Sequence, residues 1–392
     1  TNVDIDVQIP TEYSWVTLVE TKSLDEKSVY LAVEENTSQV ERRATITITN
    51  ERNNVSDTVI ITQEGNIIIV ELNEAGTLKD VLGDNYLDII SLKIIGPING
   101  DDINYLRKMI GVRGFSEAEW GKLTTLDLSE ASIESGGQYR VIKDGSVRNC
   151  KTIKNKIADH MFFDCKTLKK VNLPNNVLEI NEKAFYGCTN LESINLPDCL
   201  SDINSEAFYG CSSLNAIDLP DSLAYIGNYA FYGCGLSSIK IPQKITIISY
   251  GAFSGCHSLK SVKIPSHVTE ILPRAFADCT SLVSIYLGSG VKDIYSYAFE
   301  GTNVKDFYCL AFAAPTLHGK IHYTVGGNNP SGSKCWHDAL EDLDQATLHI
   351  FKTNVGYSTD LANMTYYSCS WKSHFKSVQY HSSFIETHEG WR

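Results

Sequence analysis

Hydrophobic residues recur at a fixed interval through the middle of the chain. Between residues 161 and 309 one unit is repeated: Ala-Phe, a small pair, Cys, two polar residues, Leu-x-x-Ile-x-Leu-Pro, then Val or Leu, then Ile. Its phenylalanines are 23 residues apart, with one interval of 22, and they are Phe162, Phe185, Phe208, Phe231, Phe253, Phe276 and Phe299. The cysteines keep the same step at Cys165, Cys188, Cys211, Cys234, Cys256 and Cys279, and so do the prolines at Pro174, Pro197, Pro220, Pro242 and Pro265. This regularity predicts a structure that repeats along its axis.

Within each unit, the alternation of apolar and polar residues predicts a short strand. In residues 191–203, Leu191, Ile194 and Leu196 face inward and the residues between them face outward, as the pleat of a strand requires. Pro197 ends the strand, because it has no N–H to donate to a neighbouring strand. A period of about 20–29 residues with this leucine spacing is typical of a leucine-rich-repeat solenoid. We therefore predict a mainly β fold built around a right-handed solenoid.

The rest of each unit predicts a one-turn helix. Residues favoured at helix N-caps recur where it would begin, at Asn181, Asn204, Gly227 and Ser249. The phenylalanines that follow predict a stacked aromatic spine. A cofactor site lined by them is the alternative, and it is disfavoured because buried phenylalanine most often serves packing. One coil cannot bury its own apolar side, so both ends of the stack need covers.

Residues 1–66 predict a separate domain of short strands. In residues 44–49 threonine alternates with alanine and isoleucine, which is the pattern of a half-buried strand. The predicted strands are Val3–Ile9, Trp15–Val19, Val29–Val33, Ala44–Thr49 and Val59–Thr62. Their number and spacing suit a small β-sandwich.

Three stretches of sequence in this segment also resemble a known family of domains. Glu35–Thr37, Glu41–Thr49 and Val59–Gly65 resemble BACON-type domains, which are immunoglobulin-like modules at the front of surface and secreted proteins of gut anaerobes. The resemblance implies carbohydrate binding or a spacer role. Trp15 could stack on a sugar, although a lone tryptophan in so small a sandwich is more often part of the core.

Two flanking regions complete the predicted organisation. Residues 67–122 predict an N-terminal cap with a degenerate repeat, residues 123–309 the solenoid and residues 310–392 a C-terminal cap. The elements expected before the solenoid are strands at Ile67–Val70 and Ile89–Ile94, a helix opening at Gly76–Lys79, and a helix Asp101–Met109 capped by Asp101 or Asp102. Residues 134–150 form an insertion in which Gly136-Gly137 and Asp144-Gly145 mark turns. We predict a surface loop there, and a contribution to a binding site is the less favoured alternative.

After Cys309 the repeat decays. Strand and aromatic character returns at Ala346–Ile350 and Trp371–Phe375, and Gly326–Gly332 has the composition of a loop. These signals predict a cap with some added structure.

The repeats as a whole resemble the BspA-like leucine-rich repeats of bacterial surface proteins, over roughly residues 76–380. Residues 184–197 closely match that repeat unit, with the sequence Ala-Phe-Tyr-Gly-Cys-Thr-Asn-Leu-Glu-Ser-Ile-Asn-Leu-Pro. Trp371–Phe375 fits the Trp-x-x-x-Phe element of the family's ending, whereas His349–Lys352 lacks the proline usual after that strand. The resemblance implies a non-catalytic adhesion or recognition role at the cell surface, with no ligand motif to carry over.

The net charge and the hydropathy of the chain limit the ligands and the cellular locations that we expect. With 34 basic and 47 acidic residues the formal net charge is -13, which argues against nucleic acid as a ligand. No run approaches the ~18 apolar residues of a membrane span. The chain starts with polar residues, as a mature or trimmed protein would. We expect a cell-surface or secreted protein, and a lipid anchor in a longer precursor is one option.

Cysteine and histidine give no strong sign of chemistry. The six column cysteines are expected to pack as small hydrophobes, with Thr302 in that slot in the last unit. Some of the other five could pair, so the redox compartment stays open: Cys150, Cys199, Cys309, Cys335 and Cys369. His318 and His322, near Cys335 and His337, match no strong metal template. No catalytic motif is present, so we predict no catalytic residue, metal or cofactor.

Outward strand residues supply the candidate binding site. They form two columns along the inner face of the solenoid, and the first has small residues in its middle, which lets a partner approach closely. The second column changes from amides and an acid, through two lysines, to two tyrosines: Asn172, Asn195, Asp218, Lys240, Lys263, Tyr286 and Tyr308. Tyr286 and Tyr308 are the best hot-spot candidates, since tyrosine gives contact area and a polar tip at low entropic cost. A solvated face without a ligand is an equally weighted alternative.

Together these patterns predict a non-catalytic recognition or adhesion protein that binds an extracellular protein or glycan through the inner face. The second hypothesis is glycan capture led by the N-terminal domain, with the solenoid as a spacer. An enzyme with its site in residues 310–392 is a third and weaker one.

Overall fold

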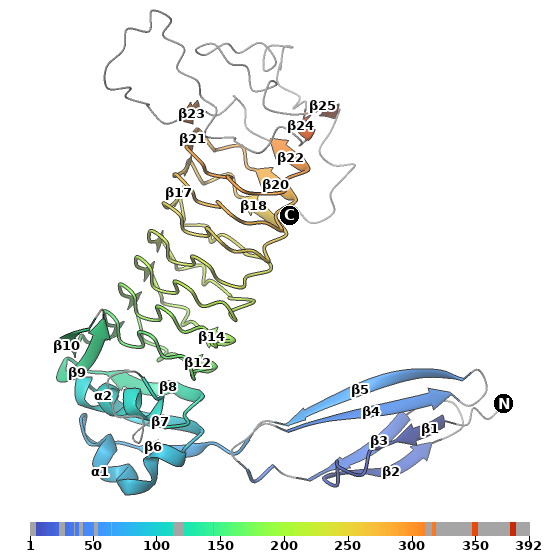
Figure 1. Cartoon of the computed structure of the whole chain (residues 1–392), viewed down its shortest axis with the longest axis vertical. Helices are drawn as coiled ribbons and strands as arrows, with labels where there is room; N and C mark the ends of the chain where they lie inside the picture. The colour runs from blue at the N-terminus through green and yellow to red at the C-terminus, as the bar shows by residue number, and fades with distance from the viewer. Residues whose placement is uncertain are drawn as a thin grey trace, which may run out of the picture.

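The computed structural model describes residues 5–22, 28–34, 36–38, 42–50, 54–63, 65–112, 121–143, 145–309, 316–318, 347–351 and 377–381. The fold is mainly β, with 35% strand and 7% helix, and its larger part is a β-solenoid of about 10 turns. Figure 1 shows the coils stacked along one axis, with the strands of the N-terminal domain beside the first coils. The predicted fold class is therefore confirmed.

The N-terminal strands form two antiparallel sheets. One sheet has the order β1-β4-β5 and the other joins β2 to β3. Their bounds are β1 Ile5–Gln8, β2 Val16–Lys22, β3 Ser28–Val33, β4 Arg42–Asn50 and β5 Val55–Gln63. Each overlaps one of the five strands predicted from the sequence.

The core of this domain contains the tryptophan that the sequence analysis singled out. Trp15 is only 8% exposed and packs with Val16, Ala44 and Ile46. The guanidinium carbon of Arg42 lies 4.3 Å from the centre of the Trp15 ring. The core interpretation of Trp15 is confirmed, and its ring is not a platform for a sugar.

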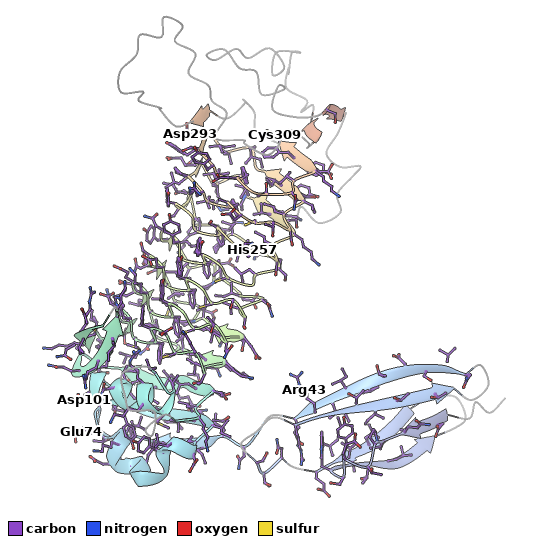
Figure 2. The ribbon with its side chains drawn as sticks, in the orientation of Figure 1. Arg43, Glu74, Asp101, His257, Asp293 and Cys309 are labelled. Atoms are coloured by element: carbon purple, nitrogen blue, oxygen red, sulfur yellow. The ribbon has the colours of Figure 1, made fainter. Side chains whose placement is uncertain are left out.

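The strands of the coils lie on two sides of the solenoid, as a first and a second parallel sheet that are each interrupted once along the stack. The first sheet contains β6 Ile68–Glu71, β7 Ser91–Ile98, β8 Thr125–Ile133, β12 Lys170–Asn172 and β14 Ser193–Asn195, and it resumes with β18 Ser261–Ile264, β20 Ser284–Leu287, β22 Asp306–Cys309, β24 Thr347–Phe351 and β25 Ser377–His381. The second contains β11 Lys156–Ile157, β13 Glu179–Ile180, β15 Asp202–Ile203 and β16 Tyr225–Ile226, then β17 Ile247–Ile248, β19 Glu270–Ile271, β21 Asp293–Tyr295 and β23 Thr316–His318. Asp293 and Cys309, labelled in Figure 2, mark the two sheets on opposite sides of the stack.

The predicted aromatic spine is confirmed. All seven phenylalanines are at most 1% exposed. Ring centroids of successive phenylalanines lie 5.1–5.7 Å apart, with interplanar angles of 1–14°. Burying one such side chain contributes about 1.5–3 kcal/mol. Each coil therefore adds one buried phenylalanine, and a similar contribution to stability, to the stack.

The cysteine column lies beside the spine and is buried as predicted. Each thiol from Cys188 onward donates to the carbonyl oxygen of the phenylalanine in the preceding coil, as Cys188 does to Phe162 at 3.1 Å. Thr302 occupies the slot in the last unit and bonds within its own coil, to the carbonyl of Phe299 at 2.8 Å. Cys150 and Cys199 are free thiols, Cys309 is buried, and Cys335 and Cys369 lie outside the described residues.

The predicted one-turn helices take a different form. Over residues 156–302 the structure has hydrogen-bonded turns in this part of the coil and no helix. Two residues per coil have positive φ, as at Lys183 (56°) and Gly187 (73°) or Tyr229 (55°) and Gly233 (66°), and Gly251 (57°) is the glycine of the first of these two columns. The left-handed residues break the helical path on either side of the buried Ala-Phe pair. The cap-type Asn204 donates to Asn181 of the coil before it at 3.2 Å, so these side chains form a ladder along the stack.

The first coils are covered by α1 Leu78–Leu82, the 3₁₀ turn η1 Gly83–Asp88 and α2 Gly100–Met109. The predicted cap of α2 was wrong: Asn99 is the N-cap, and Asp102 completes a capping box with it. The Asp102 carboxylate is 1% exposed and also accepts from the backbone N–H of Leu78 at 2.9 Å. Asp102 thus accepts backbone N–H groups at the start of both α1 and α2. It does so from the third position of α2, and not from the N-cap.

Residues 134–150 form a hairpin and not the predicted surface loop. Its strands are β9 Gly136–Lys143 and β10 Ser146–Thr152. Tyr139 and Val141 alternate with exposed residues, and both are fully buried. The hairpin packs beside α2 (Figure 1) and completes the cover of the first coil.

This cover also satisfies the backbone of the first coil. Within the stack, an N–H of each turn donates to a carbonyl of the following coil, for example Phe162 to Ala184 at 2.7 Å. The first coil has no such donor before it. Arg107 Nη1 donates instead to the carbonyls of Met161 (3.0 Å) and Phe163 (3.3 Å), and the Tyr139 hydroxyl donates to that of Asp159 (2.7 Å). Side chains of the cap replace the missing coil, as buried carbonyls require.

The repeat continues beyond the predicted limit. Strand β22 pairs in parallel with β24, and β24 with β25. The repeat therefore decays after Cys309 in the sequence but continues in the backbone, because the first sheet has two more strands there. Strand β24 confirms the prediction at Ala346–Ile350. Trp371–Phe375 and Gly326–Gly332 lie outside the described residues, and the division into four domains stays a prediction.

Candidate functional site

The exposed side of the first solenoid sheet is the candidate site, and we call it the strand face. It consists of the outward residues of the first strand in each coil, from residue 169 to residue 308. Parallel pairing places Asn172 beside Asn195, and Tyr286 between Lys263 and Tyr308. These neighbours are adjacent because the register matches equivalent positions of successive repeats.

Two middle coils carry the strand face without regular strand pairing. Residues 214–219 and 236–241 have no assigned strand, and their stacking is held by single hydrogen bonds such as Ser237 N–H to Asn215 O at 3.1 Å. The one interval of 22 residues falls here, at Gly235. A Cβ at this glycine would lie 2.4 Å from the Ser212 carbonyl oxygen. Asp218 and Lys240 stand in these two coils, and both are exposed.

Tyr286 and Tyr308 form the aromatic part of the site. Their rings are stacked, with centroids 4.5 Å apart and an angle of 3° between planes. Both side chains are partly exposed. Burial, with a contribution from the Asp306 carboxylate, raises the pKa of both phenols. The pair is therefore neutral at physiological pH and offers ring edges and hydroxyl groups to a ligand.

Four lysines lie in the coil of Tyr308 and in the two coils that precede Tyr286. Lys240 and Lys263 belong to the predicted column, and Lys260 and Lys305 each stand one residue before a strand, β18 and β22. All four are exposed. Backbone bonds from Lys305 N–H to Val283 O (2.8 Å) and from Val283 N–H to Lys260 O (2.9 Å) align these two lysines along the stack. Sequence analysis missed Lys260 and Lys305, because only two outward residues per strand were considered.

The predicted site residues thus lie on one face, with the two asparagines several coils away from the tyrosines. A ligand that covers all seven would have to extend along the stack. The structure brings Lys263, Tyr286 and Tyr308 side by side, and these three form the nucleus of the candidate site.

A second aromatic row was missed. Phe163, Tyr186, Tyr209 and Tyr232 stack in successive coils with centroids 4.4–5.1 Å apart. Their signal is the tyrosine that follows the buried phenylalanine in the repeated Ala-Phe-Tyr. Burial raises the pKa of Tyr209 to about 12. Their faces cover one another, so this row contributes mainly to the stack.

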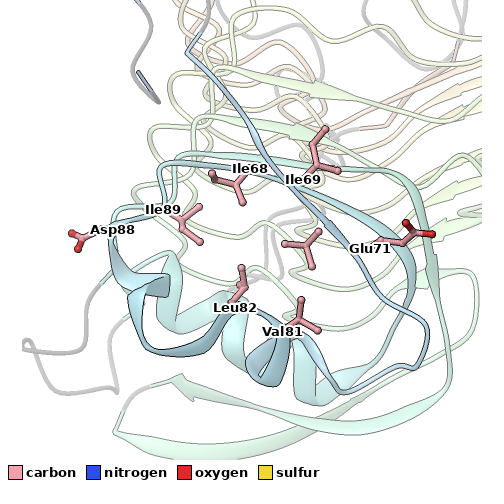
Figure 3. Close-up of a pocket in the computed structure, with 8 residues that line it drawn as sticks. Ile68, Ile69, Glu71, Val81, Leu82, Asp88 and Ile89 are labelled. Carbon is pink, nitrogen blue, oxygen red and sulfur yellow. The ribbon is translucent and has the colours of Figure 1, made fainter. Parts of the chain in front are cut away.

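A groove of about 550 Å³ lies at the first end of the solenoid, between β6 and α1. Figure 3 shows Ile69, Val81 and Leu82 around it, with Glu71 and Asp88 at its margin. Ile69 is 60% and Val81 55% exposed. This groove is far along the stack from the tyrosine pair, and its lining is mainly aliphatic.

In the part of the chain that the structure describes, no group of three or more His, Cys, Asp or Glu side chains could hold a metal ion. The region of His318, His322, Cys335 and His337 falls outside the described side chains. Among the helices that the structure describes, none is long and apolar enough to cross a bilayer.

Two families match the chain. Residues 147–257 and 201–311 match the BspA-type leucine-rich repeat region, in 6 copies. Residues 6–64 match the BACON family, described as a putative N-terminal binding domain. No curated protein gave a significant match.

Solved structures with the same kind of repeat are also similar. A leucine-rich repeat protein from Bacteroides ovatus is 22% identical, with coverage of 62% of this chain and 67% of that one and a TM-score of 0.36. One from T. pallidum is 34% identical, with coverage of 42% and 66% and a TM-score of 0.31. One from Eubacterium ventriosum is 21% identical, with coverage of 61% and 65% and a TM-score of 0.39. The chain spans about two thirds of the length of these proteins. The chain therefore matches the BACON family over residues 6–64 and the BspA-type leucine-rich repeat region over residues 147–311.

Proposed function

We propose that this protein is a non-catalytic recognition or adhesion protein that binds an extracellular protein or glycan through the strand face. The observation that carries the proposal is the exposed, stacked pair Tyr286–Tyr308 next to Lys263. Partly exposed tyrosines fixed in one geometry supply contact area and hydroxyl groups with little rotamer entropy left to lose on binding.

The scaffold suits this role. The phenylalanine spine, the hydrogen bonds of the cysteine column and the capped first coil fix the backbone beneath the strand face. A preorganised surface keeps more of its contact energy on binding, because less ordering is needed. The proposed location at the cell surface or outside the cell rests on the BspA type of the repeats.

The N-terminal domain is the weaker candidate for ligand capture. Its one tryptophan is buried beneath Arg42, so the residue that favoured sugar stacking there is no longer available. A spacer role for this domain is consistent with its small core of Trp15, Val16, Ala44 and Ile46.

A capture experiment tests the proposal. The intact chain would be used to pull down partners from host mucosal extract and, in parallel, to probe a glycan array. Partners found with the wild type would then be titrated with the double variant Tyr286→Ala/Tyr308→Ala. We expect a loss of at least about tenfold in affinity, as for hot-spot tyrosines. Unchanged binding to every partner found would refute the strand face as the site.

A further inference from the structure

The charge on the strand face changes along the stack. In the coils of residues 169–172, 192–195 and 215–218, two lysines are offset by Glu192 and Asp218, and Lys169 lies 3.6 Å from Glu192. In the next four coils, up to residue 308, the outward positions carry four lysines and one acid. We call this second part the cationic patch: Lys240, Lys260, Lys263 and Lys305, together with Tyr286 and Tyr308.

The cationic patch is unusual for this chain, whose net charge is -13. The four lysine side chains are exposed. Among the described residues, no carboxylate lies within 4.0 Å of the amines of Lys240, Lys260 or Lys305. The acid of the patch is Asp306, which is half-buried beside the tyrosines. Like charges held this close repel one another, so an anionic partner would stabilise them.

The remaining outward positions are small. Ser238, Ser261 and Ser284 form a row beside the lysines and tyrosines, in register across adjacent coils for Ser261 and Ser284. A chain lying across the strands could therefore approach the backbone and bond to serine hydroxyls. Four coils at the usual spacing of strands span about 14 Å. That length suits several units of an extended polymer better than a single small anion.

We propose that the cationic patch binds an acidic polysaccharide, whose carboxylate or sulfate groups pair with the lysines while its sugar rings pack against Tyr286 and Tyr308. This inference rests on the proposed function and names the ligand class for the same site. Sugars fit the patch because tyrosine edges present both apolar carbon and hydroxyl groups, and because the row of serines leaves room for a chain of rings. Lysine acts as a point charge and accepts either kind of anion.

The test compares polymers that differ only in charge or in the kind of charge. Binding of the intact chain would be measured to dextran, to dextran sulfate, to polygalacturonate and to double-stranded DNA. The key variant is Lys240→Gln/Lys263→Gln. Its matched control is Lys244→Gln/Lys292→Gln, which removes the same charge from exposed lysines of the solenoid outside the strand face.

We expect binding to dextran sulfate or polygalacturonate, no binding to dextran, and affinity that falls as NaCl rises from about 50 to 200 mM. The two charged polymers distinguish sulfate from carboxylate as the favoured anion. The key variant should weaken binding roughly tenfold, whereas the control should stay within about twofold. Tyr286→Ala/Tyr308→Ala should also weaken it.

Three results would overturn the inference: no binding to either acidic polysaccharide, equal losses for the two lysine variants, or binding to DNA as tight as to the polysaccharides. The last two would indicate general charge attraction. None of these results decides the proposed function, which depends on whether the tyrosine variant loses the partners captured by the wild type.

Discussion

Arg107 Nη1 donates a hydrogen bond to the carbonyl oxygen of Met161 at 3.0 Å, 54 residues later in the chain. The equivalent carbonyl of the next coil, Ala184, accepts the backbone N–H of Phe162. An arginine side chain of the cap thus occupies the place of a backbone donor from a preceding coil. The guanidinium is 1% exposed, and its bonding atoms also reach the carbonyls of Arg140 and Phe163.

Replacing Arg107 should therefore loosen the first end of the solenoid. Arg107→Met keeps much of the buried stem but leaves the carbonyls of Met161 and Phe163 without donors. We expect a loss of about 3 kcal/mol in the free energy of unfolding, measured by urea denaturation. Arg107→Lys, which keeps a charge and one donor group, should lose less. Equal stability of Arg107→Met and wild type would mean that water replaces the side chain.

The aromatic spine gives a second prediction. Phe208 stacks between Phe185 and Phe231 at 5.2 and 5.3 Å and is fully buried. Phe208→Ala should cost about 3–5 kcal/mol, because it leaves a cavity that adjacent coils cannot fill. Phe208→Leu, which keeps most of the volume, should cost clearly less. If both variants unfold at the same urea concentration, volume at this position does not govern stability.

The turns give a third prediction, with a matched control. Gly251 has φ +57°, and a Cβ there would lie 2.4 Å from the Tyr229 ring, whereas Gly210 has φ +73° and no atom within 4 Å of its Cβ position. Both alanine variants carry the cost of a left-handed alanine, about 1–2 kcal/mol. Gly251→Ala should be the less stable by thermal denaturation, because it must also displace Tyr229. A smaller effect at Gly251 than at Gly210 would contradict the packing described.

The second aromatic row predicts a dependence on alkaline pH. The pKa of Tyr209 is raised to about 12, chiefly by burial, above the ordinary value near 10. Its contribution to stability is therefore complete below pH ~10 and is lost as pH rises through ~12, since only the unfolded state ionises readily. Tyr209→Phe cannot ionise, so its unfolding midpoint should fall less between pH 8 and pH 11 than that of the wild type. Parallel declines would exclude Tyr209 as a source of the alkaline loss.

Sequence patterns predicted the repeating part of the fold because each element there is local. The alternation in residues 44–49 and the step between phenylalanines are set by neighbouring residues, and stacking follows from repetition. The adjacency of Tyr286 and Tyr308 could be predicted for the same reason, since they occupy equivalent positions one repeat apart.

What the sequence did not reveal depends on contacts between distant segments. Tyr139 and Val141 alternate as a strand should, but the glycines around them favoured a loop interpretation. Arg107 resembles any helical arginine until its partners in the first coil are known. The first left-handed column contains lysine, glutamate, tyrosine and arginine, so no residue type there reports its conformation, whereas the second column is mostly glycine.

The most direct test of the central claim is hydroxyl-radical footprinting of the intact chain with and without a captured ligand. The account predicts that Tyr286 and Tyr308 are protected when the ligand is bound, while Tyr209, on another part of the coil, reacts at an unchanged rate. Unchanged reactivity of Tyr286 and Tyr308, with protection confined to residues 5–63, would contradict it and assign the ligand to the N-terminal domain.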